Sequence, residues 1–501
     1  MSGRSLLAVK IALGALGLGL LGGILFSDTA FGINAALWTL ALFVSGAIVF
    51  RSGQIEVSKK SLALLLPALF FTIGFALQDS PGLRVANAIC LVVSMSFAAT
   101  HLQNKSVDKM TLLDSTIGWM VSMVTLIVDT FALWIEDIQW KLIGSKINTR
   151  NITPYLRGIA FAVPIVIVFG LLMASADAVF GKFAATAFKL DLSSAFVHGL
   201  RVVAFMSLAV AVMRRAFLGQ ALNIRPVAKE DDVERTTSTE SIIVVAALDV
   251  LFAIFVAIQF RYLYGGHDMV SATTGLTYSE YARRGFFELV AITALALPVL
   301  LACTHSVANA SSTVRKSFKV FAVGLVFMLG VVMASAIQRM SLYVASLGMS
   351  ELRLYTSAFM GWMALVYVAY FLTYLRDRPA KFSYLSLAAG LAVCIGLNAL
   401  RPGAFIADYN VAASRFGAHL DVDYLTTLGT DSVPALMRAW PDLNKNDKTV
   451  AANWLQEVDS RWSPDWRSWN WSRNEAHRLI GQKKTEIAAL AANGAAIAYS
   501  D

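Results

Sequence analysis

The stretch Leu6–Phe26 reads LLAVKIALGALGLGLLGGILF, and Phe31–Phe50 follows it closely with FGINAALWTLALFVSGAIVF. Each run has the length of about 20 residues that an α-helix needs to cross a hydrocarbon core of about 30 Å. Neither run alternates apolar and polar residues, so neither resembles a strand of a membrane barrel. A backbone inside a bilayer must satisfy its own hydrogen bonds, and we therefore predict two spanning helices.

Runs of the same kind continue along the chain to residue 400. Of the 501 residues, 57% are hydrophobic and 15% are charged, whereas soluble proteins are about 45–50% apolar and about 25% charged. We therefore predict an all-α, polytopic membrane helix bundle over residues 1–400. Its further spans are Ser61–Gln78, Val85–Ala99, Gly158–Ala174, Phe196–Leu218, Ser241–Tyr262, Phe286–Cys303, Phe318–Ala336, Tyr355–Leu375 and Tyr384–Leu400.

One run, Ile117–Ile135, is ambiguous. If it does not cross the membrane, most Lys and Arg residues of the first 400 fall in loops on one side, as the positive-inside rule requires. If it crosses, the basic loops of one half of the protein fall on the wrong side. We therefore predict about 11 spans, with residues 117–135 as a re-entrant or interfacial helix, the N-terminus inside and the C-terminus outside. The alternative is 12 spans.

The formal net charge of +9 belongs to the membrane part, because acidic and basic residues nearly balance from Arg401 onward. A nucleic-acid-binding protein would instead gather its basic residues on one soluble face. The expected partners are therefore membrane lipids and a protein partner, and no nucleic acid.

Residues 401–501 have the mixed composition of a small soluble helical domain, which we place on the outer face. Capping residues mark its helices. The predicted caps and helices are Asp421 for Val422–Leu428, Thr430 or Asp431 for Ser432–Trp440, Asp447 for Lys448–Trp462, Ser463 with Pro464 for a helix toward Gln482, and a last helix over Thr485–Ala496.

No short motif in the sequence indicates a particular reaction. Gly17–Gly22 matches a dinucleotide fingerprint in letters, but it lies inside a span with no strand before it. Ala15, Gly19 and Gly23 instead have the spacing of a close helix–helix contact. The three Cys and six His residues show no metal-ligand spacing, so we expect no metal, no cofactor and no disulfide. Catalytic residues stay unknown.

Ionisable residues inside spans are more informative, because a charge in lipid is costly and usually faces protein or water. Asp249 lies near the middle of its span, Asp129 lies in the ambiguous run, and Arg201 follows His198 by three residues on one helix face. These four residues are the candidate intramembrane polar site, with Asp249 the strongest. The alternative is a set of salt bridges that fix helix packing.

A second candidate site lies on the outer face, where the segment 259–288 is dense in polar residues. Arginines there can hold an anionic lipid or a phosphate. They can also serve, with neighbouring tyrosines, as anchors at headgroup level. The candidate residues are Arg261, Arg283, Arg284, Glu288 and Asp177.

Six of the 11 Trp residues lie in the C-terminal domain. Trp462, Trp466 and Trp469 have the spacing i, i+4, i+7 of one helix face. They can pack against the membrane domain, lie in the headgroup layer or stack on a glycan.

Several of these segments, in this order, resemble a bacterial multi-pass family known as domain of unknown function 4153/4173. The resemblance implies a protein of the bacterial inner (cytoplasmic) membrane, with a cytoplasmic N-terminus and a periplasmic C-terminal domain, and it implies no activity. The segments are 259–266, 276–289, Met349–Tyr355, Tyr409–Val411, Arg415, Asp421, Tyr424 and Leu425, Asp431–Leu436, Asp465–Asn470, and Ser472 with Arg473.

We therefore expect a non-enzymatic envelope component, either a transporter-like carrier or a scaffold for a partner. One alternative is a membrane enzyme that acts on a lipid-linked or cell-wall substrate at the outer surface. Glu288, Asp177 or an aspartate of the C-terminal domain would then be the base. The other alternative is a sensor that signals through a partner protein.

Overall fold

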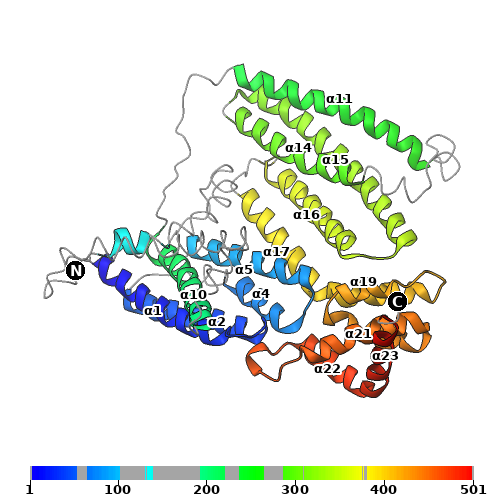
Figure 1. Ribbon diagram of the computed structural model, residues 1–501. Helices are drawn as coiled ribbons and strands as arrows, with labels where there is room; N and C mark the ends of the chain where they lie inside the picture. The colour runs from blue at the N-terminus through cyan, green and yellow to red at the C-terminus, as the bar shows by residue number, and fades with distance from the viewer. Residues whose placement is uncertain are drawn as a thin grey trace, which may run out of the picture.

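The computed structural model describes residues 3–53, 65–101, 130, 132–138, 192–219, 236–264, 286–308, 310–374, 376 and 381–498 (Figure 1). Within these ranges, helices make up all the regular secondary structure. The apolar helices are α1 (Gly3–Leu25), α2 (Ile33–Gly53), α4 (Leu66–Leu77), α5 (Pro81–His101), α10 (Leu192–Leu218), α11 (Thr236–Tyr264), α14 (Phe286–Val307), α15 (Ser312–Leu347), α16 (Glu351–Tyr374) and α17 (Phe382–Leu400).

By length and composition, 8 of the described helices can cross a membrane, and α4 and the apolar part of α5 are shorter. The prediction of an all-α, multi-pass membrane protein is confirmed. The run Gly158–Ala174 lies outside the described residues, as does most of Ile117–Ile135. Of the latter, the structure describes Thr130 and the start of a short π-helix, η2 (Leu133–Asp137). The exact number of spans stays a prediction.

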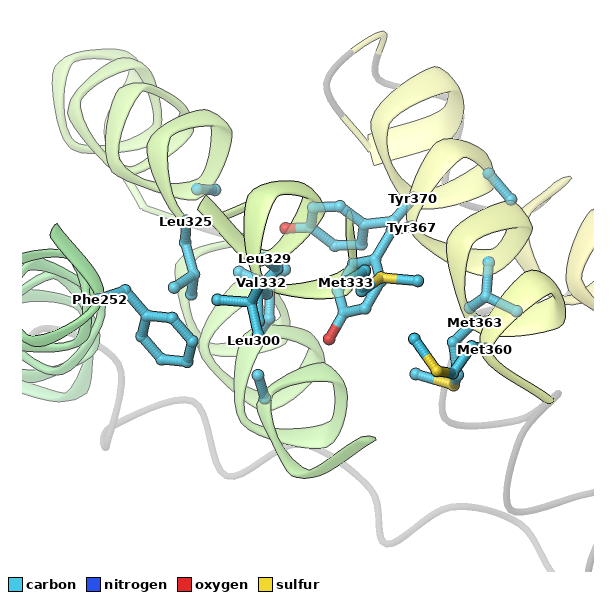
Figure 2. Close-up of a cluster of buried hydrophobic side chains, with 14 of the residues drawn as sticks. Phe252, Leu300, Leu325, Leu329, Val332, Met333, Met360, Met363, Tyr367 and Tyr370 are labelled. Atoms are coloured by element: carbon cyan, nitrogen blue, oxygen red, sulfur yellow. The ribbon is translucent and has the colours of Figure 1, made fainter. Parts of the chain in front are cut away.

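The membrane helices form two bundles, each with its own apolar core. The first bundle comprises α1, α2, α4, α5 and α10, and η2 also packs into it. The second bundle comprises α11, α14, α15 and α16. Figure 2 shows side chains of α11, α14, α15 and α16 meeting in this second core, among them Phe252, Leu300, Leu329 and Tyr367. Helix α17 packs against both α16 and α5 and so lies between the bundles.

Glycines bring α1 and α10 into close contact. A Cβ atom at Gly19 would lie 2.7 Å from the carbonyl oxygen of Val202 and 2.8 Å from Cβ of Met206. A Cβ atom at Gly23 would lie 2.6 Å from a methyl carbon of Val202. These positions therefore need glycine, and the predicted small-residue contact is confirmed.

The C-terminal helices pack around a core of their own, which also includes Leu354 of α16. We call residues 401–498 the C-terminal unit. Its helices are α18 (Pro402–Ser414), α19 (Val422–Thr427), α20 (Val433–Ala439), α21 (Lys445–Ser460), α22 (Trp471–Gln482) and α23 (Lys484–Ala498), with 3-10 turns η4 (Thr430–Ser432), η5 (Trp440–Asp442) and η6 (Trp466–Ser468).

One predicted cap and one predicted helix of the C-terminal unit are confirmed. Asp421 caps α19 by accepting a hydrogen bond from the Tyr424 backbone N–H at 2.9 Å. The final helix α23 also lies where the alanine-rich end predicts it. The prediction that Asp447 caps a helix is wrong, because Asn444 caps α21 by accepting from the Asp447 N–H at 2.9 Å.

The predicted helix from Ser463 toward Gln482 is also wrong. Asp465 caps the 3-10 turn η6, and the chain then extends until Asn470 caps α22 by accepting from the Arg473 N–H at 3.0 Å. Trp462 lies before this break and stacks on His477 at 3.9 Å between ring centroids. The expected common helix face of Trp462, Trp466 and Trp469 therefore does not exist.

The predicted helix Ser432–Trp440 is divided. A 3-10 turn, η4, covers Thr430–Ser432, and α20 begins only at Val433. The side chain of Asp431 caps no helix, because it bonds to Asp79 and Ser472 instead.

Candidate functional site

Asp249 lies in the middle of α11 on the side that faces α15. Val245 and Phe252, one turn before and after it, are buried, whereas Val250 and Leu251 are exposed on the outer side of the helix. The Asp249 carboxylate points at Gly324 of α15, where a Cβ atom would lie 3.4 Å from Oδ2. Glycine at this position therefore leaves space beside the carboxylate.

The surroundings of this carboxylate are apolar. Oδ1 of Asp249 is buried and has no hydrogen-bond partner among the residues that the structure describes. An ionised carboxylate pays a large desolvation cost in such a place unless it is paired, and it tends to take up a proton instead. Chemically, this site can bind and release a proton, or bind a small cation.

Arg201 and His198 belong to a different place. Arg201 Nη2 lies 3.2 Å from Oδ1 of Asp28, which follows α1 and is exposed. The hydrogen bond from Arg201 lowers the pKa of Asp28 below its ordinary value. The His198 ring lies against Gly23 of α1, 3.0 Å from where a Cβ atom would be. Since α10 packs on α1 while α11 packs on α14 and α15, these residues do not join Asp249 (Figure 1).

Among the remaining candidate site residues, the structure describes the side chain of Glu288 and leaves the others outside its described ranges. Glu288 is exposed in the first turn of α14. Asp129, Asp177, Arg283, Arg284 and the side chain of Arg261 lie outside the described residues.

The first bundle contains a buried ion cluster that the sequence does not predict. Asp137 of η2 accepts hydrogen bonds from Nε of Arg214 at 2.7 Å and from Nε of Arg4 at 2.8 Å. The side chains of Asp137 and Arg214 are each 1% exposed. Arg215 is also buried and donates to Oγ of Ser96 at 2.9 Å. The sequence signal was an acidic residue directly after an apolar run, together with an arginine pair at a span end.

Several of the later segments that carry the family resemblance meet where the C-terminal unit contacts the membrane helices. Asp431 is buried there, and its Oδ2 accepts a hydrogen bond from the Asp79 backbone N–H at 3.0 Å. Its Oδ1 accepts from the Ser472 hydroxyl and lies 3.6 Å from Arg401. Burial raises the pKa of Asp431 above its ordinary value.

Asp79, in the turn between α4 and α5, is the counterpart on the membrane side. Its Oδ2 accepts from the Thr430 hydroxyl at 3.1 Å, and its Oδ1 lies 3.6 Å from Arg84 and 3.8 Å from Arg473. The Asn470 amide donates beside it to the carbonyl oxygens of residues 75 and 78, at 2.8 and 2.9 Å. The first bundle is therefore attached to the C-terminal unit through buried polar bonds.

The second bundle is attached through the turn between α15 and α16. Asn410 exchanges two hydrogen bonds with the backbone of Met349, at 2.8 and 2.9 Å. The Glu351 N–H donates to the Tyr424 hydroxyl at 2.7 Å, and the Glu351 carboxylate accepts from Ser80 at 3.0 Å. We call this set of contacts, with those of Asp79 and Asp431, the joint. The joint positions the turn between α4 and α5, the turn between α15 and α16, and the C-terminal unit relative to one another.

A shallow groove lies on the C-terminal unit, between α20 and α22. Its volume is about 320 Å³, and Met437, Leu479, Arg438 and Glu475 are among the residues that line it. Within the described ranges, no group of three His, Cys, Asp or Glu residues is placed to hold a metal ion.

The comparisons with known proteins give one match. A family model described as "Domain of unknown function (DUF4153)" matches residues 65–439, a range that includes Asp249 and most of the joint. No curated protein and no solved structure matches the chain.

Proposed function

The chain belongs to the family described as domain of unknown function (DUF4153), and from that premise we propose that it is a transporter-like carrier of the cell envelope. Asp249 is the residue that takes up and releases the coupling proton. The observation that carries the proposal is the buried Oδ1 of Asp249, which lacks a hydrogen-bond partner among the described residues. An intramembrane acid without a partner is costly to keep unless it has a function.

The proposed site works through the charge of one side chain. When Asp249 binds a proton, the carboxylate becomes a neutral acid and its desolvation cost falls. The neutral form is stable against Gly324 and the apolar core, whereas the ionised form is favoured when water reaches it. Movement between α11 and α15 would thereby be linked to proton uptake.

The proposal places the protein in a bacterial inner membrane, with the N-terminus in the cytoplasm and the C-terminal unit in the periplasm. The clustering of Lys and Arg in loops of one side supports this orientation. The contact of Arg215 with Ser96 joins the C-terminal ends of α10 and α5, so the two helices run in the same direction. Two parallel spans must be separated by an odd number of membrane crossings. If Gly158–Ala174 crosses between α5 and α10 and Ile117–Ile135 does not, the number is odd, which supports 11 spans over 12.

Carbodiimide labelling tests the site, because a dialkylcarbodiimide modifies protonated carboxylic acids in apolar surroundings. The reconstituted full chain is labelled at several pH values and mapped by mass spectrometry. We expect labelling at Asp249 that declines as the pH rises, and none in Asp249→Asn. Asp28→Asn is the matched control, because Asp28 is 86% exposed and already paired with Arg201.

Proton flux into proteoliposomes is the functional measurement. A pH-sensitive dye trapped inside should report uptake when a potassium diffusion potential is applied, and Asp249→Asn should abolish that uptake. The proposal fails if Asp249→Asn conducts protons as the wild type does, or if Asp249 resists the carbodiimide at every pH at which the protein stays folded.

The groove between α20 and α22 favours a second candidate, a scaffold that binds a protein partner. It combines the apolar Met437 and Leu479 with the charged Arg438 and Glu475. Leu479→Arg should then release a partner that copurifies with the wild-type protein while leaving proton flux intact.

A further inference from the structure

Three tryptophans of the C-terminal unit are unusually exposed. Trp466, Trp469 and Trp471 are 62%, 40% and 51% accessible, whereas Trp440 of the same unit is 1% accessible. Trp466 lies in η6, Trp469 directly follows η6, and Trp471 begins α22. Three indole rings in water forgo the free energy of apolar burial. Their exposure therefore indicates that something outside this chain covers them.

This segment is attached to the ends of membrane helices through backbone and side-chain hydrogen bonds. The Ile33 N–H at the start of α2 donates to the Trp469 carbonyl oxygen at 3.0 Å. The Arg467 guanidinium donates to the Ile24 carbonyl oxygen at the end of α1. A Cβ atom at Gly32 would lie 2.7 Å from the Ser468 carbonyl oxygen, so the two chains lie in direct contact. The three rings are therefore held at the level where the spans end.

The membrane helices also expose apolar side chains at the ends that contact this segment. Ile24 of α1, Phe31 before α2 and Leu77 of α4 are all exposed. Asn470 connects to the end of α4 through the carbonyl oxygens of residues 75 and 78. Exposed apolar side chains of the first bundle therefore lie at the same helix ends to which the tryptophan segment is bonded.

We propose that Trp466, Trp469 and Trp471 lie in the lipid headgroup layer and anchor the C-terminal unit to the bilayer surface. An indole ring has an apolar body and one N–H donor, which suits the boundary between acyl chains and headgroups. The charged neighbours Arg467 and Asp465 pair with each other at 2.6 Å. The anchor therefore depends on the rings, and it needs no anionic lipid.

Fluorescence quenching in phosphatidylcholine vesicles tests the anchor on the full chain. The emission of Trp466→Phe/Trp469→Phe/Trp471→Phe is subtracted from that of the wild type, and the difference reports the three rings. We expect lipids brominated near the glycerol end to remove this difference emission more effectively than lipids brominated near the chain end. Adding an anionic lipid should change nothing. The matched control is Trp440→Phe, whose difference emission should respond to neither lipid, because Trp440 is buried.

Two results would overturn the anchor. Difference emission that acrylamide quenches freely and brominated lipid does not would place the rings in water, open to a glycan. Difference emission that neither agent quenches would place them against protein. If the triple variant does not fold, Trp466→Phe alone gives the same reading for the most exposed ring.

Discussion

The two bundles treat an acidic side chain between their helices in opposite ways: Asp137 is buried, whereas Asp249 is half-buried with its Oδ1 covered. In the first bundle, Asp137 is paired with Arg214 and Arg4, and all three side chains meet within hydrogen-bond distance. In the second bundle, Asp249 faces a glycine, and its Oδ1 has no partner among the described residues. A buried pair keeps its charges satisfied, whereas a lone acid is free to titrate. The comparison separates a charge that holds helices together from one that is available for chemistry.

Removing the paired acid should have the largest effect on this contrast. Asp137→Asn removes a buried carboxylate charge from the guanidinium of Arg214, and breaking such a buried pair costs about 3–5 kcal/mol. We expect a large fall in the thermal unfolding midpoint of the detergent-solubilised protein. Asp28→Asn breaks an exposed pair and should leave the midpoint nearly unchanged. Equal midpoints for the two variants would mean that the Asp137 cluster does not support the first bundle.

Replacing a glycine at a helix contact should have the next largest effect on stability. Gly19→Ala places a methyl group 2.7 Å from the Val202 carbonyl oxygen, and such overpacking costs about 1–3 kcal/mol. Gly324→Ala meets its nearest atom, Oδ2 of Asp249, at 3.4 Å, so it should cost much less. The same unfolding measurement compares the two bundles directly, and carbodiimide labelling of Asp249 should fall in Gly324→Ala. A larger loss of stability in Gly324→Ala than in Gly19→Ala would reverse the contrast.

Replacing the lone acid should act in the opposite direction to replacing the paired one. Asp249→Leu removes a half-buried carboxylate whose covered Oδ1 has no partner among the described residues, and it adds apolar volume next to Gly324. We expect the free energy of unfolding to rise by about 1 kcal/mol. Chemical denaturation of the reconstituted protein measures it. A marked destabilisation would show that Asp249 has a structural partner after all.

The joint should give the smallest effect, seen as a pH dependence. Since burial raises the pKa of Asp431, the attached state binds the Asp431 proton more tightly than the unfolded state does. The stability of the wild type should therefore rise as the pH falls through the raised pKa, and the gain should be complete below the ordinary value of 3.8. Asp431→Asn should lose this part of the pH dependence when the slopes of the unfolding midpoint against pH are compared. Identical slopes would contradict it.

Hydropathy alone predicted the helical class and the positions of the described membrane helices, because a span must be long and apolar regardless of its neighbours. Hydropathy did not predict which charged side chains pair with each other. Arg214 lies near the end of the predicted span Phe196–Leu218, and nothing in that run indicates that its side chain is buried against Asp137 from a distant segment. Such a pairing depends on how helices pack, and a single sequence does not contain that information directly.

In the C-terminal unit, too, local features were predicted from the sequence and long-range contacts were not. Asp421 was predicted as a cap because a cap bonds within three residues. Asp431 looked like another cap, but its carboxylate bonds to Asp79 and Ser472. Ser463 before Pro464 looked like a helix start, but the Asn470 side chain starts α22 and also bonds to α4. Local rules fail at these two places because long-range contacts use the same polar groups.

The joint also decides how the two bundles can move. It fixes the turn between α4 and α5 and the turn between α15 and α16 to one rigid support through Asp431, Asn470 and Asn410. The bundles can therefore separate least at that end. Any rocking motion has its pivot at the joint and its widest opening at the opposite end, where Arg4 and Asp137 lie. The C-terminal unit would therefore lie at the pivot of such a motion.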